Sequence, residues 1–262
     1  MKKALITFMK IAVFFMGWAV CTAIDIPAED PAVWRFFAEL VPLASMILFT
    51  IVFILIEKKN VRIPIAANAR EGTLVGTIAG IIWISVSAGI LIATHQLVIT
   101  GKNHIQILWL WMLSAFINVI MQELLVRGYI YQLLKTKYDL PVAIVVSTAL
   151  FSLMHGGAFE AGLLPVVNVI TMCLFTTALY EVEGTLLAPI MAHAVWNVVG
   201  GVILGGVSLA DDYPSLYSMT PSENVILSGG ICRIEGSIVV LIVNIALMLI
   251  FLRSARKRQN KD

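Results

Sequence analysis

Long apolar runs, separated by short polar segments, make up most of this 262-residue chain. Eight stretches of about 17 to 30 residues are almost free of Asp, Glu, Lys and Arg, which is typical of helices that cross a membrane. They are 4–24, 36–56, 74–98, 105–134, 141–158, 163–181, 185–206 and 236–252. Because a helix satisfies its own backbone hydrogen bonds in lipid, the pattern predicts an all-α polytopic membrane protein with about eight transmembrane helices.

The composition agrees with this pattern and narrows the class of protein. Hydrophobic residues account for 60% of the chain and charged residues for 13%, and the mean hydropathy is +0.93. Soluble domains are about 45–50% apolar and about 25% charged. The composition therefore excludes an ordinary soluble enzyme, a disordered chain and a nucleic-acid-binding protein, and it makes the lipid bilayer the expected surroundings.

The basic residues indicate how the helices are oriented. With the N-terminus in the cytoplasm, thirteen of the eighteen Lys and Arg residues fall on inner segments, and three, Arg35, Lys102 and Arg233, fall on outer ones. This bias follows the positive-inside rule, so both termini are expected in the cytoplasm. The net charge of +2 then reflects topology and contact with anionic lipid rather than an acidic partner.

Three regions follow from the order of the spans. Residues 1–104 hold the first three helices, 105–206 hold helices four to seven, and 207–262 hold an external segment, the eighth helix and a basic cytoplasmic tail. The external part, 207–235, contains paired acids, prolines and Gly229-Gly230, which predict a loop rather than a separate domain.

Three polar pairs interrupt the apolar pattern between residues 118 and 200. They are Glu123 with Arg127, Phe151 with His155, and His193 with Asn197. Each pair is spaced i, i+4, which places both members on one helix face. Counted from the cytoplasmic ends of their helices, Glu123, His155 and His193 lie about 18, 21 and 13 Å deep. We therefore expect the three helices to converge on one polar site in the membrane.

Such residues suit hydrolysis, because ionisable groups in a membrane are costly and usually mark a functional site. His155 and His193 with a carboxylate could hold Zn²⁺ and an activated water. Without a metal, Glu123 could act as general base while His and Asn donors stabilise an oxyanion. The structural alternatives are an ion pair between Glu123 and Arg127 and a polar clamp between helices at His193 and Asn197.

These residues resemble the motifs of the CPBP family of intramembrane proteases, which comprises type II CAAX prenyl endopeptidases and bacteriocin-processing (Abi) proteins. The family pattern is Glu-Glu-x-x-x-Arg, then Phe-x-x-x-His, then His-x-x-x-Asn, and the similarity covers about 110–205. The resemblance implies an eight-helix fold that hydrolyses a peptide bond of a membrane-associated peptide or protein. It also implies that the protein crosses the cell membrane, expected to be a bacterial plasma membrane, several times. The process it implies is peptide maturation or bacteriocin self-immunity.

The resemblance also implies a role for each matching residue. His155 and His193 would be metal ligands or oxyanion donors, and Asn197 would polarise the substrate carbonyl or support His193. Arg127 would orient the acidic motif. Gln122 and Phe151 would bind substrate or mark an altered motif position.

One motif position differs from the family pattern. Gln122 stands where the family has its first Glu, the usual water-activating base, and an amide cannot take that proton. Glu123 points about 100° away from Gln122 on a helix. Either Glu123 has taken over as base, or metal-bound water needs less help from a base, or the protein binds peptides without cutting them. The leading hypothesis is thus a metalloendopeptidase or glutamate-type protease, and the alternative is a weak or silent member with a peptide-binding, immunity or regulatory role.

Overall fold

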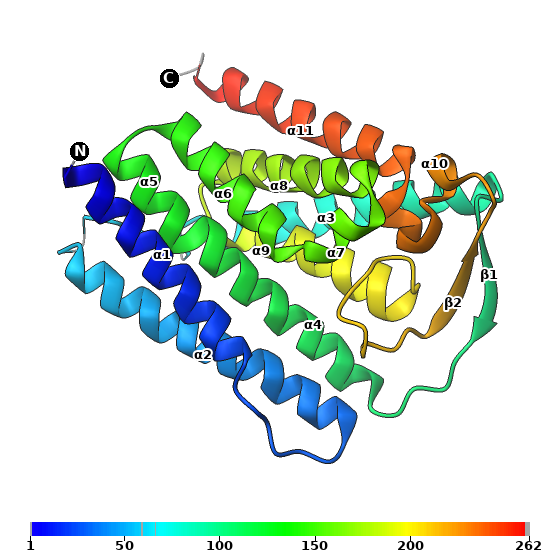
Figure 1. Cartoon of the computed structure of the whole chain (residues 1–262). Helices are drawn as coiled ribbons and strands as arrows, with labels where there is room; N and C mark the ends of the chain where they lie inside the picture. Colours follow the sequence, from blue (N-terminus) through cyan, green and yellow to red (C-terminus); the bar gives the residue numbers. More distant parts are fainter. Residues whose placement is uncertain (1, 59, 66, 260–262) are drawn as a thin grey trace. The chain divides into compact units, whose positions relative to one another are not determined.

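A computed structural model describes residues 2–58, 60–65 and 67–259, and helices dominate it (Figure 1). Six described segments are long and apolar enough to cross a membrane. They are Lys2–Thr22 (α1), Pro31–Ile56 (α2), Ala69–Ala93 (α3), Leu108–Lys137, Leu163–Glu183 (α8) and Gly230–Ser254. Two shorter apolar helices are Leu140–Met154 (α6) and Leu187–Ile203. Each of the eight predicted spans coincides with one of these helices, so the fold class of an all-α polytopic membrane protein is confirmed.

Several of these helical segments are composite. Residues 108–137 comprise α4 (Leu108–Glu123), a π-helix (Leu124–Ile130) and α5 (Tyr131–Lys137). Residues 187–203 comprise α9 (Leu187–Val195) and a second π-helix (Trp196–Ile203). The last span joins a 3₁₀ helix (Gly230–Gly236) to α11 (Ile238–Gln259). The remaining short helices are α7 (Gly156–Ala161) and α10 (Val225–Ser228).

The chain forms two compact units. The first comprises Met1–Ile63 with Ile107–Ser147, and the second comprises Pro64–Gln106 with Thr148–Asp262. In the first unit α2 packs against both α1 and α4. Its apolar centre is an aromatic cluster in which the rings of Phe14, Phe53 and Tyr129 lie 4.6–5.3 Å apart between centroids. This cluster holds the start of the chain against the π-helix of residues 124–130.

In the second unit α3 packs closely against α9, and α8 packs against α11. A Cβ added at Gly76 would overlap the carbonyl of Ala188, and one at Gly80 would lie 2.8 Å from the carbonyl oxygen of Ala192. This small-residue pair therefore allows two helix backbones to approach, as its spacing predicts. The ring of Trp83 on α3 stacks on that of Trp196 at 3.9 Å between centroids.

A short antiparallel ribbon corrects two boundaries predicted from the sequence. Strand β1 (Leu97–Lys102) pairs with β2 (Tyr217–Pro221), with a register shift between Ile99 and Gly101. The third span ends at Ala93 instead of 98, and the segment 207–235 holds a strand and two short helices instead of only a loop. The ribbon is not evident from the sequence, because its two strands are more than 110 residues apart and stabilise each other only when paired.

The predicted span 141–158 is also wrong at one end, because α6 stops at Met154. His155 departs from helical geometry with φ −103° and ψ 51°, and α7 follows it. Fifteen residues of α-helix rise only about 22 Å, less than the roughly 30 Å core of a bilayer. The two short apolar helices, α6 and residues 187–203, hold Phe151 and the His193–Asn197 pair, and His155 follows directly after α6.

Candidate functional site

The acidic motif of the first unit contains a buried ion pair. Nη1 of Arg127 lies 2.7 Å from both carboxylate oxygens of Glu123, and both side chains are fully buried. Glu123 ends α4, and Arg127 lies in the π-helix that follows. The ion pair that the i, i+4 spacing indicates is therefore present, and it compensates two charges that would otherwise be costly in an apolar interior.

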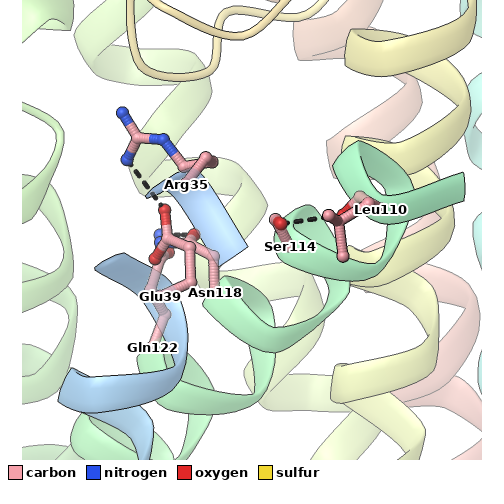
Figure 2. A network of polar contacts seen from close by, with 6 residues as sticks. All are labelled: Arg35, Glu39, Leu110, Ser114, Asn118 and Gln122. Atoms are coloured by element: carbon pink, nitrogen blue, oxygen red, sulfur yellow. Dashed lines mark hydrogen bonds and ion pairs between the residues drawn. The ribbon is translucent and has the colours of Figure 1, made fainter. Parts of the chain in front are cut away.

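Gln122, at the altered motif position, belongs to a second polar cluster of the same unit (Figure 2). Its Nε2 donates to Oδ1 of Asn118 at 2.6 Å, and Nδ2 of Asn118 donates to Oε2 of Glu39 at 2.7 Å. Nη1 of Arg35 donates to Oε1 of Glu39 at 3.1 Å. Figure 2 shows Glu39 on α2 facing Asn118 on α4, so two helices meet through this cluster.

Three members of this cluster, Arg35, Glu39 and Asn118, are not among the site residues that the sequence predicts. Glu39 is placed by sequence near the start of a span, whereas α2 begins eight residues earlier, at Pro31, and leaves Glu39 only 5% exposed. Its position in an apolar run, four residues after Arg35, was a usable signal. Asn118 had none, because an amide within an apolar helix does not indicate which distant side chain it meets.

The second unit brings two predicted histidines together around one aromatic ring. The ring of Phe151 lies 4.4 Å from that of His155 and 6.0 Å from that of His193, centroid to centroid. Nδ1 of His155 lies 2.8 Å from the carbonyl oxygen of Phe151. Because a carbonyl only accepts, Nδ1 is the donor, which places the lone pair of a neutral His155 on Nε2.

His193 and Asn197 occupy the junction between an α-helix and a π-helix. His193 is 1% exposed near the end of α9, and Asn197 is 6% exposed at the second residue of the π-helix. Arg127 lies in the other π-helix. π-Helical turns are rare and are found frequently at functional sites, and the i, i+4 pattern of the sequence does not reveal them.

The predicted site residues thus form two groups. Gln122, Glu123 and Arg127 lie in the first unit, and the second holds Phe151 and the other three, His155, His193 and Asn197. The convergence of these two groups on one site stays a prediction.

The histidine pair supplies only part of a zinc site. Within either unit, the described residues contain no group of three His, Cys, Asp or Glu side chains that could hold a metal ion. A catalytic zinc usually has three protein ligands, of which His155 and His193 would be two. The zinc ion stays a prediction.

The helices and their buried polar groups define a multi-pass α-helical membrane protein. Residues 104–199 match the model of the Rce1-like family, described as type II CAAX prenyl endopeptidase Rce1-like. This segment is therefore similar to that family, as the motif resemblance predicts, and all seven predicted site residues fall within it. No curated protein and no solved structure matched the chain.

Proposed function

We propose that this protein is an intramembrane endopeptidase that hydrolyses a peptide bond of a membrane-associated peptide or protein. The observation that carries the proposal is the placement of His155 and His193 against the same Phe151 ring, inside the segment that matches the Rce1-like family. Two imidazoles that share one aromatic neighbour can act on the same substrate group.

In this proposal the second unit stabilises the reacting carbonyl. His193 and Asn197 would donate hydrogen bonds to the oxyanion of the tetrahedral intermediate. His155, held through its Nδ1–H, would present Nε2 to water or to a metal ion. Arg127 contacts both oxygens of Glu123, so Glu123 would have to turn from Arg127 before it could accept a proton from water.

The test is proteolysis in reconstituted liposomes. A farnesylated C-terminal peptide and its unprenylated form are offered to the wild type, His155→Ala and His193→Ala. Each alanine variant should lower kcat/KM by about 10²-fold or more, because acid–base and oxyanion contributions are of that size. His104→Ala, an exposed histidine of the same segment, is the matched control and should cleave normally. Equal cleavage by all four proteins would refute the proposal.

A silent peptide-binding, immunity or regulatory protein is the second candidate, and Gln122 is the observation that favours it. An amide at the family's base position can hold water but cannot take its proton. If the wild type binds the peptide without cleaving it and Gln122→Glu gains cleavage, this second candidate is correct. If the wild type cleaves and both histidine variants do not, it is excluded.

Metal dependence and location are proposed separately. If a zinc ion binds to His155 and His193, the purified wild type should contain about one metal ion per chain. The His193→Ala variant should have lost it, and elemental mass spectrometry measures the metal content of both proteins. Wild-type protein free of metal yet able to cleave would instead support a glutamate-type protease.

We also propose that the protein resides in the bacterial plasma membrane and acts in peptide maturation or bacteriocin self-immunity. A deletion strain challenged with a bacteriocin tests the role in self-immunity.

A further inference from the structure

The cluster around Gln122 has only one consistent direction of hydrogen bonding. A guanidinium only donates and a carboxylate only accepts, so the bond between Arg35 and Glu39 is fixed in sense. The atom of Asn118 that faces Glu39 must then be its Nδ2. Amide nitrogens and oxygens are usually assigned from such networks, and here the two charged residues at one end decide the assignment.

The orientation of Gln122 follows from that of Asn118. With Nδ2 of Asn118 committed to Glu39, its Oδ1 faces Gln122, and Gln122 must present Nε2. Oε1 of Gln122 is left buried, with no hydrogen-bond partner in the part of the chain that the structure describes. A buried acceptor without a partner is costly, so this oxygen is suited to receive a donor from a bound molecule.

We propose that Arg35, Glu39 and Asn118 are positioning residues that hold Gln122 as a hydrogen-bond acceptor and keep the single carboxylate of this cluster at position 39 instead of position 122. The donor it receives would be the attacking water, and this part rests on the proposed protease function. Residues 35 and 39 lie outside the range that matches the Rce1-like family. The Gln at position 122 is, in this view, the partner that Glu39 and Asn118 require.

This chain of hydrogen bonds predicts different effects for substitutions at its two ends, positions 122 and 39. In Gln122→Glu, the new carboxylate would face Oδ1 of Asn118, and both atoms only accept hydrogen bonds. If the amide of Asn118 turned over, its Oδ1 would instead face the carboxylate of Glu39. In Glu39→Gln, Arg35 can still donate to the new amide, and the amides of Asn118 and Gln122 can both reverse, so the bonds survive but Gln122 presents an N–H outward. In the double variant Glu39→Gln/Gln122→Glu every bond is satisfied again in the reversed sense, with the carboxylate moved to position 122.

The experiment is a double-mutant cycle on the full-length protein in detergent, read as apparent Tm. Gln122→Glu should lower Tm by about 4–8 °C, from the usual effect of one unsatisfied buried polar group in a protein of this size. Adding Glu39→Gln should recover at least about half of that loss. Gln106→Glu, the same change at an exposed glutamine, is the matched control and should leave Tm within about 2 °C.

Two outcomes would overturn the hydrogen-bond chain. One is a Gln122→Glu protein as stable as the control variant, and the other is a double variant whose Tm loss equals the sum of the two single losses. Either would mean that positions 39 and 122 are not coupled through Asn118.

Cleavage measured on the same variants tests the link to water. Glu39→Gln should lower kcat by about tenfold or more with a smaller change in KM, because Gln122 then offers a donor where water needs an acceptor. The double variant, with a carboxylate at position 122, should exceed Glu39→Gln in kcat. Unchanged kcat in Glu39→Gln would overturn the role of Gln122 in holding water. If the wild type cleaves no substrate, the protease proposal fails. The double-mutant cycle in Tm still tests whether positions 39 and 122 are coupled through the hydrogen bonds of Asn118.

Discussion

Replacing Arg127 with Met tests how much the buried ion pair of the acidic motif contributes to stability. The two side chains are fully buried, and Nη1 of Arg127 lies 2.7 Å from both oxygens of Glu123. Removing one member takes away the charged partner of the other, and breaking a buried ion pair in this way costs about 3–5 kcal/mol. For a protein of this size that corresponds to a fall in Tm of roughly 6–20 °C.

The assay is thermal unfolding in detergent across a double-mutant cycle. Glu123→Gln/Arg127→Met removes both charges, and buried pairs replaced together are often nearly neutral, so the double variant should be more stable than Arg127→Met alone. Arg253→Met, at an exposed arginine of α11, is the matched control and should change stability by less than about 0.5 kcal/mol. A loss in Arg127→Met no larger than in this control, or a double variant less stable than either single variant, would refute the reasoning.

Two further predictions concern packing and pH. Gly80→Ala should destabilise by about 1–3 kcal/mol, because its Cβ would lie 2.8 Å from a carbonyl oxygen of α9, whereas Gly89→Ala, with nothing within 4 Å, should stabilise slightly; chemical denaturation of both variants decides this. Burial by itself would raise the pKa of Glu57, but its hydrogen bonds to Lys10 and Lys137 outweigh burial and lower that pKa. The stability that Glu57 contributes is therefore present above about pH 4.3, its unfolded value, and is lost as pH falls through the lower folded value. Tm measured from pH 7 to pH 3 should fall more in the wild type than in Glu57→Gln, and parallel curves would contradict it.

The eight helices were predictable because apolarity is a local property. A run of about twenty apolar residues has few alternatives to a helix in lipid, so every predicted span contains one. The ion pair between Glu123 and Arg127 was predictable for the same reason, since both ends lie within one helical turn. The similarity to a protease family was predictable from short motifs in a fixed order, and residues 104–199 match that family's model.

Boundaries and irregular helices were not predictable in the same way. The strands β1 and β2 form only with each other, and the π-helices at residues 124–130 and 196–203 continue directly from α4 and α9 within single apolar segments. His155 fits the i, i+4 pattern after Phe151, yet the helix ends one residue before it. Composition decides that a segment is helical, and packing against neighbours decides where the helix stops or widens.

By itself, the sequence determined a helical membrane protein, its apolar spans and the short motifs that resemble those of a protease family, because each motif or span depends on neighbours within a few turns of helix. Only the tertiary structure decided that Glu39 reaches Gln122 through Asn118 and that the Phe151 ring contacts both His155 and His193. The contacts of Glu39 with Asn118 and of Phe151 with His193 join side chains from different helices, and Glu39 and Asn118 are 79 residues apart in the chain. Hydrogen bonds and ring contacts depend on distance in space, which helix packing sets and spacing along the chain does not.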